Sequence, residues 1–257
     1  QLNQLLAYVQ SQSGDYTSVL REAQAAVTAA EGAGRRPGED DLLRLADAQN
    51  RTGNKAGYSG TLEKLVTYYP KKDYWSAHLA NLQRKPGFSD RLGIDVMRLK
   101  LKQGLITKGD EYMEMAQLAM QAGLPTEAKG IMDKGYAAGL LGVGEQADRQ
   151  KRLKDLIVKT EAETNAGLEA SVTAAMGLKD GNDLVKAGTV YASRGEGAKA
   201  VSLLEQGIAK GNLRRLDDAK LRLGLAQLMT PATKTKGMQT LRSIDAMIGL
   251  PCRPRGS

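Results

Sequence analysis

The stretch Asn182–Lys210, NDLVKAGTVYASRGEGAKAVSLLEQGIAK, constrains the fold of this chain more than any other segment. Its first half places small and apolar residues at i, i+3, i+4 and i+7, which is the spacing of one helix face. These residues are Leu184, Ala187, Gly188 and Tyr191. The run 192–197 (ASRGEG) then favours a turn, because glycine and serine interrupt helices. The stretch therefore predicts two helices joined by a short turn.

The second helix of this stretch carries Ala200, Leu204 and Gly207 on one face. Small residues on both faces let two helices approach closely, so we expect Gly188 to lie against the second helix. Tyr191 and Leu204 are large enough to fill the space between the helices. The rest of the chain repeats this spacing with less fidelity, which indicates a protein built from helix hairpins.

The composition agrees with an all-α fold. Of 257 residues, 41% are hydrophobic and 26% are charged, while only 4% are aromatic. Ala, Leu, Lys and Glu favour helices, and runs of β-branched residues are absent. No apolar run approaches the ~20 residues needed to cross a bilayer. One elongated repeat domain could hold the whole length.

A period of 34 residues begins at Glu39, after a helix pair predicted in 2–31 and a loop in 31–39. Each period predicts a first and a second helix. In the first repeat their faces are Leu42, Leu45, Ala46 and Gln49, then Tyr58, Leu62 and Leu65. In the second repeat they are Ser76, Leu79, Ala80 and Gln83, then Leu92, Val96 and Leu99. The third repeat pairs Tyr112, Met115, Ala116 and Ala119 with Ala128, Met132 and Gly135, and Pro125 begins its second helix.

The segment 147–180 has the weakest pattern. We favour two helices with a turn near Thr160–Asn165, and a single long helix over 149–176 is the alternative. A last pair is expected over 217–229 and 236–248, with one residue inserted relative to the period. Its faces are Leu223, Gly224 and Gln227, then Gly237, Leu241 and Ile244. About six to seven helix pairs follow for the chain.

These in-phase positions resemble the tetratricopeptide repeat (TPR) family over 39–248. Two segments, 62–101 (LEKLVTYYPKKDYWSAHLANLQRKPGFSDRLGIDVMRLKL) and 110–141 (DEYMEMAQLAMQAGLPTEAKGIMDKGYAAGLL), are similar to exported TPR proteins of proteobacteria. The resemblance implies a right-handed α-solenoid of TPR-like helix hairpins. It also implies a periplasmic or envelope-associated location, with a signal peptide and further repeats upstream of Gln1. The expected division is 1–38, a helix pair and loop; 39–248, the solenoid; and 249–257, a disordered tail.

The resemblance further implies a concave groove lined by the first helix of each repeat, where family members bind peptides or helices. The groove residues carried onto this chain are Asn50, Arg51, Tyr74, Asn81, Arg84, Met113, Gln117, Met120 and Gln121. Asn and Gln there could hydrogen-bond a peptide backbone. Met113 and Met120 either contact a partner or pack internally. Tyr74 belongs to an aromatic cluster that we otherwise expect to lie in the core. Tyr74 itself is the member that we expect to be available to a partner.

The residue set argues against catalysis and metal binding. His78 is the only histidine, and Cys252, the only cysteine, lies in the tail 249–257, which resembles the remnant of an engineered protease site. A Ser-His-Asp or Cys-His arrangement would need both a histidine and its partners. The carboxylate pairs Asp40-Asp41, Asp110-Glu111 and Asp217-Asp218 are expected at helix starts, where they oppose the helix dipole. We expect no enzyme activity, no cofactor and no metal.

The net charge of +8 is unevenly distributed. Residues 39–108 hold 13 Lys/Arg against 8 Asp/Glu, residues 109–180 hold 8 against 12, and residues 181–257 hold 13 against 6. The positive charge thus flanks an acidic middle and forms no continuous stripe, which does not favour nucleic acid as partner. The basic run around Arg214-Arg215, with Lys220 and Arg222, is the better candidate for an acidic partner.

The leading hypothesis is a non-enzymatic scaffold that binds a protein or peptide partner in its groove. One alternative is a binder of an anionic ligand, such as nucleic acid or a polyanionic glycan, through basic helix faces. Another is a structural element that assembles with copies of itself. The sequence names neither the partner nor the oligomeric state.

Overall fold

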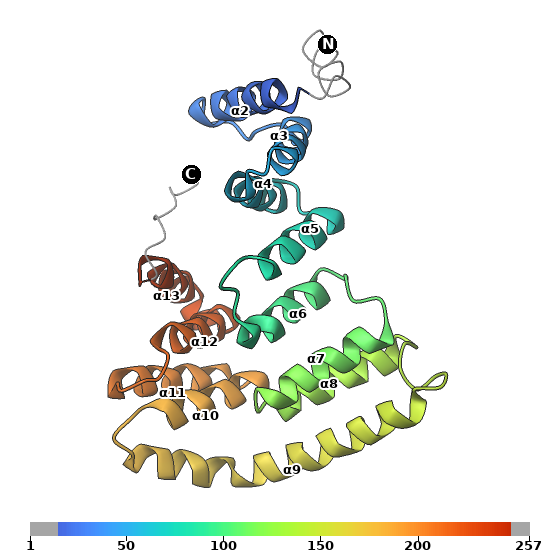
Figure 1. The fold of residues 1–257 in the computed structure, drawn as a ribbon. Helices are drawn as coiled ribbons and strands as arrows, with labels where there is room; N and C mark the ends of the chain where they lie inside the picture. Colours follow the sequence, from blue (N-terminus) through green and yellow to red (C-terminus); the bar gives the residue numbers. More distant parts are fainter. Residues whose placement is uncertain (1–14, 248–257) are drawn as a thin grey trace. The chain divides into compact units, whose positions relative to one another are not determined.

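The computed structural model describes residues 15–247, with side chains over 15–244, and these residues are helical with no strand among them. The first helix predicted within 2–31 and the tail 249–257 lie outside this range. The helices of the described range are α2 (Tyr16–Gly32), α3 (Glu39–Arg51), α4 (Lys55–Tyr68), α5 (Lys72–Gln83), α6 (Gly93–Lys102), α7 (Gly109–Gln121), α8 (Pro125–Ala137), α9 (Ala147–Gly177), α10 (Asn182–Ser193), α11 (Gly197–Lys210), α12 (Leu216–Met229) and α13 (Lys234–Met247), with 3₁₀ turns η1 (Asp90–Leu92) and η2 (Pro231–Thr233) (Figure 1). The prediction of an all-α fold is confirmed.

The chain divides into two compact units, 1–107 and 108–257. The first contains α2 to α6 and the second α7 to α13, and in each unit helices that follow one another in sequence pack together. The predicted division at 38/39, with one uninterrupted repeat domain over 39–248, stays a prediction.

The core of the first unit lies between α2, α3 and α4. Leu42, Leu45 and Leu65 are at most 1% exposed, and Val27 on α2 is fully buried against them. The predicted faces of the first repeat therefore meet as expected. One polar pair is buried beside this core, since Thr61 Oγ1 donates to Gln49 Oε1 at 2.8 Å. Buried side-chain polar atoms need such partners, so this bond holds α3 and α4 in a defined register.

The hairpin α10/α11 in the second unit packs as its glycines predict. A Cβ on Gly188 would lie 2.8 Å from Leu204 Cγ and 3.1 Å from the carbonyl oxygen of Ala200. Only glycine leaves room for this contact between the helices. Tyr191 is 1% exposed and Leu204 is fully buried, so they fill the space as expected. Gly195 takes a φ of 78° in the turn, which glycine adopts without strain.

The hairpin α12/α13 has the same construction with one additional residue. A Cβ on Gly224 would meet Leu241 at 2.6 Å, and one on Gly237 would lie 2.9 Å from the Gly224 carbonyl oxygen. Here Thr240 Oγ1 donates to the Oε1 atom of the fully buried Gln227 at 2.7 Å. This bond corresponds to the one between Thr61 and Gln49 in the first unit. The predicted faces of the last pair are therefore confirmed, and they include a matching hydrogen bond.

The prediction of a turn near Thr160–Asn165 is wrong, because α9 runs unbroken over 31 residues. The six residues TEAETN at 160–165 contain neither glycine nor proline, unlike the turn of α10/α11. Their propensities permit a helix, and nothing in the backbone forces a reversal. At ~1.5 Å per residue the helix extends about 46 Å.

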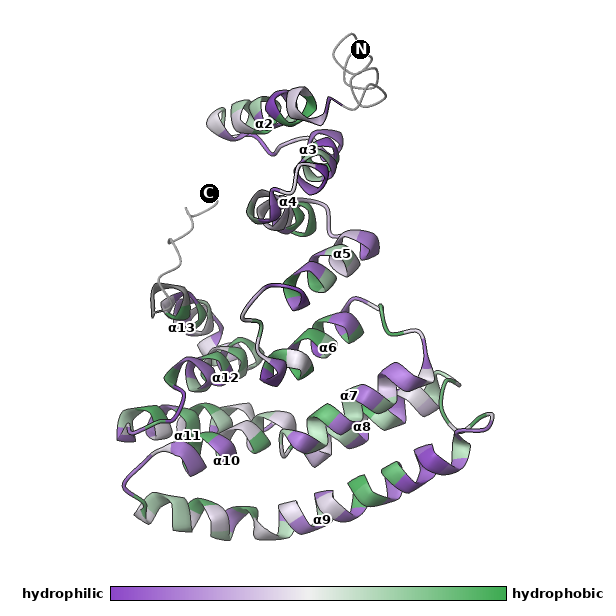
Figure 2. Ribbon diagram, in the orientation of Figure 1, coloured by the Kyte–Doolittle hydropathy of each residue, from purple (hydrophilic) through white to green (hydrophobic). Residues whose placement is uncertain are grey.

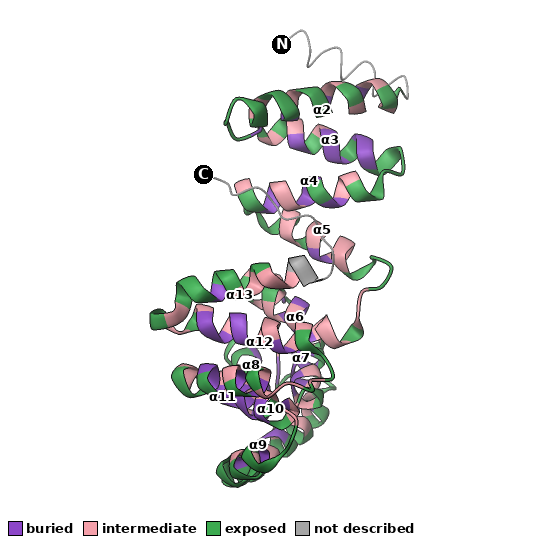
Figure 3. Ribbon diagram, turned by 90° about the vertical axis from the view of Figure 1, so that its left-hand side faces the viewer, coloured by how far each residue is buried: buried purple, intermediate pink, exposed green. Residues whose placement is uncertain are grey.

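Continuous α9 packs on two neighbours, α8 and α10. Its buried side chains, Gln150, Ile157, Leu168 and Ala175, follow one face. Figure 2 shows its first turns as the more hydrophilic part, and Figure 3 shows mostly exposed residues along its outer side. Within the described residues the chain thus forms five helix pairs, which are α3/α4, α5/α6, α7/α8, α10/α11 and α12/α13. The long helix α9 lies alone between the third and the fourth pair in sequence.

Candidate functional site

The only histidine of the chain, His78, lies on α5. The His78 ring stands edge-on to Trp75 with ring centroids 6.1 Å apart. Burial lowers the pKa of His78, and the charge of Lys85 lowers it further, so the ring is neutral at pH 7. Neither Nδ1 of His78 nor Nε1 of Trp75 has a hydrogen-bond partner among the described residues. The pair packs without the acceptor that would orient a general base.

The carboxylate pairs sit where the sequence predicts, in the first turns of their helices. Asp40 and Asp41 begin α3, Asp110 and Glu111 begin α7, and Asp217 and Asp218 begin α12. Negative charge at these positions stabilises the helix dipole. Over residues 15–247, no group of three or more Asp, Glu, His or Cys side chains is arranged to hold a metal ion.

Two predicted groove residues close α3. Asn50 is exposed, and Arg51 is exposed but held on both sides. The Arg51 guanidinium donates from Nε to Asp47 at 2.9 Å and lies 4.7 Å from the ring centre of Tyr16 on α2. Arg51 therefore joins α3 to α2, and a ligand would have to compete with these contacts.

Tyr74 is engaged inside its own unit. Its hydroxyl donates to Glu39 on α3, and Lys71 also pairs with Glu39 at 2.6 Å. The hydrogen bond to the Glu39 carboxylate, followed by burial, raises the pKa of Tyr74 to about 12. The bonds from Lys71 and then Tyr74 lower the pKa of Glu39. Half-buried against the α2–α4 core, Tyr74 joins α5 to α3.

Asn81 and Arg84 differ in how much surface they offer. Asn81 is half-buried and donates from Nδ2 to Ser59 Oγ on α4 at 2.8 Å. Arg84 follows the last turn of α5, is exposed, and makes no side-chain hydrogen bond or ion pair among the described residues. Arg84 is the freer of the two to meet a partner.

The remaining predicted groove residues lie on α7, in the second unit. Met113 is only 6% exposed, so it offers little surface to a partner. Gln117 and Met120 are half-buried, and Gln121 is exposed. The corresponding positions of α10 carry Val185, Thr189, Ala192 and Ser193, and the Thr189 hydroxyl is used within its own helix by the carbonyl of Val185.

Gln117, Met120 and Gln121 form one surface on α7, which we call the α7 face. Their i, i+3 and i+4 spacing places them on the same side of the helix. The amides of Gln117 and Gln121 make no side-chain hydrogen bond within the described residues. Unpaired amides beside a half-buried methionine are a surface that can bind both backbone and apolar groups. The predicted groove draws residues from both units, so its continuity stays a prediction.

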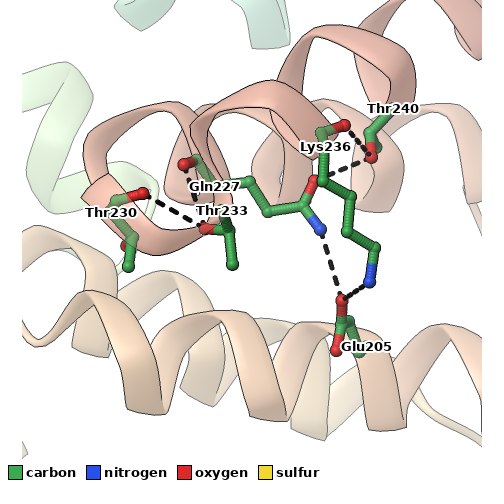
Figure 4. Close-up of polar contacts among 6 residues, drawn as sticks. All are labelled: Glu205, Gln227, Thr230, Thr233, Lys236 and Thr240. Atoms are coloured by element: carbon green, nitrogen blue, oxygen red, sulfur yellow. Dashed lines mark hydrogen bonds and ion pairs between the residues drawn. The ribbon is translucent and has the colours of Figure 1, made fainter.

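A dense polar cluster joins α11, α12 and α13 (Figure 4). Gln227 Nε2 donates to Glu205 at 3.3 Å, and Lys236 pairs with the same Glu205 oxygen at 2.6 Å. The Thr233 hydroxyl donates to the Gln227 carbonyl oxygen at 3.1 Å. Because both polar atoms of the Gln227 amide are satisfied, this cluster stabilises the helix contacts and offers little to a ligand.

A second cluster, around Glu169 on α9, was not found from the sequence. The Tyr191 hydroxyl on α10 donates to Glu169 at 2.6 Å, and Lys199 on α11 pairs with the same carboxylate. The bonds from Lys199 and then Tyr191 lower the pKa of Glu169, and they raise the pKa of Lys199. Lys199 also lies 4.3 Å from the Tyr191 ring centre. Finding this cluster required knowing that α9 runs past α10.

In the described part of the chain, no helix is both long and apolar enough to span a membrane. No protein-family model matches the chain, and no curated protein matches its sequence.

Proposed function

We propose that the chain is a TPR-like α-solenoid that acts as a non-enzymatic protein–protein interaction scaffold. In this proposal α3, α5, α7, α10 and α12 are the first helices of successive hairpins, and α9 replaces one hairpin. The close contact of Gly188 with Leu204 and Ala200 supports the assignment, because the repeat pattern requires small residues at those positions. The resemblance of 62–101 and 110–141 to exported proteins supports a location in a bacterial envelope.

The observation that carries the proposal is the α7 face. Gln117 and Gln121 present unpaired amides beside Met120, on a helix whose opposite side is buried through Met115 and Ala119. An extended peptide leaves water with its backbone donors and acceptors unsatisfied, and an amide side chain can satisfy one of each. A helix held rigid by its own core loses little entropy on binding, so the ordering cost falls on the ligand.

The partner is therefore expected to be a peptide or helix that combines backbone polar groups with an apolar side chain for Met120. Arg84, an exposed groove residue of the first unit, would favour a carboxylate in a ligand of that unit. Asn81, Tyr74 and Arg51 are assigned to internal contacts in this proposal, because each already binds a neighbouring helix. Met113 is assigned to the core.

The test is a photocrosslinking experiment on the full chain in envelope extracts. A crosslinking amino acid replaces Gln121 in one protein and Lys134 of α8, an exposed residue outside the α7 face, in a matched control. A discrete partner captured from position 121 and not from position 134 is the expected result. The variant Gln117→Ala should reduce capture from position 121, while its circular dichroism stays unchanged. Equal capture from 121 and 134 would contradict the proposal.

A further inference from the structure

Two loops at one end of the second unit are joined into a single surface. The α9–α10 connection and the α11–α12 connection lie at the same end of α10 and α11 (Figure 1). The backbone N–H of Gly181 donates to the Gly211 carbonyl oxygen at 3.0 Å. The Asn182 side chain adds two bonds. Its Nδ2 donates to the Asn212 carbonyl oxygen at 3.2 Å, and its Oδ1 accepts from the backbone N–H of Arg214 at 3.0 Å. Five exposed residues form the surface that we call the loop corner: Met176 in the last turn of α9, Leu178 and Lys179 in the first loop, and Arg214 and Arg215 in the second.

The loop corner holds apolar side chains in water on a fixed backbone. Met176 is 45% exposed and Leu178 is 43% exposed, whereas the preceding Ala175 is buried in the core at 2%. Lys210 fixes the chain at this point, since its Nζ donates to the carbonyl oxygens of Ala175 and Met176 at 3.0 and 2.6 Å. The exposure of Met176 and Leu178 is therefore a property of an ordered surface, and such apolar surface favours a binding partner.

The charges at the loop corner are positive and unpaired. Lys179, Arg214 and Arg215 are exposed, and none of their side chains forms an ion pair with another described residue. The carboxylate of Asp180, which follows Lys179 in the sequence, already accepts hydrogen bonds from the backbone N–H and Nδ2 of Asn182, at 3.0 and 2.7 Å. The charge of Arg214 acts on this carboxylate without forming an ion pair with it. Guanidinium groups with free donors bind carboxylates in a two-point geometry. This separates the loop corner from Lys154, Lys199 and Lys236, whose charges are paired within the fold.

We propose that the loop corner docks an acidic segment of a partner protein that also carries apolar side chains. The apolar side chains cover Met176 and Leu178, and the carboxylates pair with Lys179, Arg214 and Arg215. The charge complementarity requires an acidic partner, and the exposed Met176 and Leu178 require that it be partly apolar. A nucleic acid fits less well, because the corner has no aromatic side chain on which a base could stack. The loop corner is separate from the α7 face and does not depend on it.

The test uses the full chain and fluorescence anisotropy with a synthetic probe. The probe is a fluorescein-labelled peptide of ~16 residues with Glu on one helical face and Leu on the other. Two comparison peptides replace Glu by Gln or Leu by Ser, and a labelled single-stranded DNA of equal length supplies a polyanion without apolar side chains. We expect the Glu/Leu peptide to bind most tightly, with an affinity that falls as salt is added, because ion pairs at a surface are screened.

The variants separate this site from general charge attraction. Arg214→Glu/Arg215→Glu is expected to weaken binding about tenfold or more, and Met176→Ser/Leu178→Ser about threefold or more. The matched control Lys134→Glu/Arg149→Glu makes the same charge change at exposed, unpaired cations of the same unit and should leave the affinity within about twofold. Thermal unfolding of Arg214→Glu/Arg215→Glu and of Met176→Ser/Leu178→Ser should stay close to that of the wild type, since the two arginine side chains have no ion-pair partner among the described residues and the two apolar side chains are exposed.

Three results would overturn the proposal. Equal weakening by the 134/149 control would show that only net charge matters. Undiminished binding of the Gln peptide would remove the acidic requirement. Tighter binding of the DNA, unaffected by the changes at 176 and 178, would assign the corner to polyanions instead. Crosslinking at position 121 is independent of all three, so this inference and the scaffold proposal can fail separately.

Discussion

The hairpin α10/α11 and the helix α9 use similar lengths of chain, yet one folds back on itself and the other does not. In the hairpin, Gly195 reverses the chain with a φ of 78°, and Gly188 lets the two helices touch. In α9 the residues at 160–165 include neither glycine nor proline, and a Cβ on Gly167 would meet nothing within 4 Å. The difference shows that a repeat unit needs both a chain reversal and a close-contact site. Apolar residues at a helical spacing occur in both segments, so they do not distinguish a hairpin from one long helix.

The largest effect is expected from proline in the middle of α9. Glu163→Pro removes one helix hydrogen bond and forces its ring against the preceding turn, which costs about 3 kcal/mol or more inside a helix. Chemical denaturation followed by circular dichroism measures the loss. Glu163→Ala is the control and should stay within about 0.5 kcal/mol of the wild type. Equal stability of the two variants would mean that the chain already turns at this position.

The next effect should come from filling the contact inside the hairpin. Gly188→Val places side-chain carbons where Leu204 Cγ and the Ala200 carbonyl oxygen lie within 2.8 and 3.1 Å of the Cβ position. Overpacking of this kind costs about 1–3 kcal/mol, and valine adds no compensating burial. A drop in the denaturation midpoint with an unchanged slope would agree with this expectation. A neutral substitution would contradict the close approach of α10 and α11.

The opposite sign is expected for the glycine of the long helix. Gly167 is in a regular helix with open space around it, so Gly167→Ala should stabilise the protein by about 0.5–1 kcal/mol. The same measurement on Gly188→Ala should show destabilisation, because its Cβ already meets neighbouring atoms. Equal changes in stability for Gly167→Ala and Gly188→Ala would contradict the view that close packing at the glycine distinguishes α10/α11 from α9.

The smallest effect should be a pH dependence at the junction of the two segments. Glu169 has a folded-state pKa below its ordinary 4.5, first because Lys199 and then because Tyr191 bonds to it. A carboxyl group of this kind contributes stability above its unfolded pKa and loses it as the pH falls through the folded pKa. Glu169→Gln should therefore lower the melting temperature at pH 7 and matter progressively less below about pH 4.5. A difference independent of pH would exclude the carboxylate charge as the cause.

Much of the fold could be predicted because the residues that pack the two helices of a hairpin together lie close to one another in sequence. Leu184, Tyr191 and Leu204 show their buried faces through helical spacing, and Gly188 and Gly224 mark contacts with the following helix. The turn of α10/α11 is visible in its glycines. The continuity of α9 was missed because spacing alone does not distinguish one helix from two, and the absence of glycine and proline at 160–165 was the better signal.

The candidate site could be predicted only in part, because its residues depend on contacts distant in sequence. Tyr74 bonds to Glu39, 35 residues earlier, and Asn81 bonds to Ser59, 22 residues earlier. No local pattern contains these pairs, so positions that match a groove also match a helix junction. Gln117 and Gln121 remain available because α7 brings no partner to them. Lys179, Arg214 and Arg215 meet through two loops, and only the bonds of Asn182 reveal this.

Two of the buried glutamines, Gln49 and Gln227, have a consequence for how such a chain can change in length. Gln49 and Thr61 are 12 residues apart, whereas Gln227 and Thr240 are 13 apart, yet both pairs form the same bond. A strict period of 34 residues would shift the sequence of the last helix by one residue. Such a shift rotates the helix face by about 100° and would turn Thr240 away from Gln227. The 3₁₀ turn Pro231–Thr233 accommodates the additional residue before α13 begins. The bond thus fixes the same register in the two hairpins α3/α4 and α12/α13, although their connecting segments differ in length by one residue.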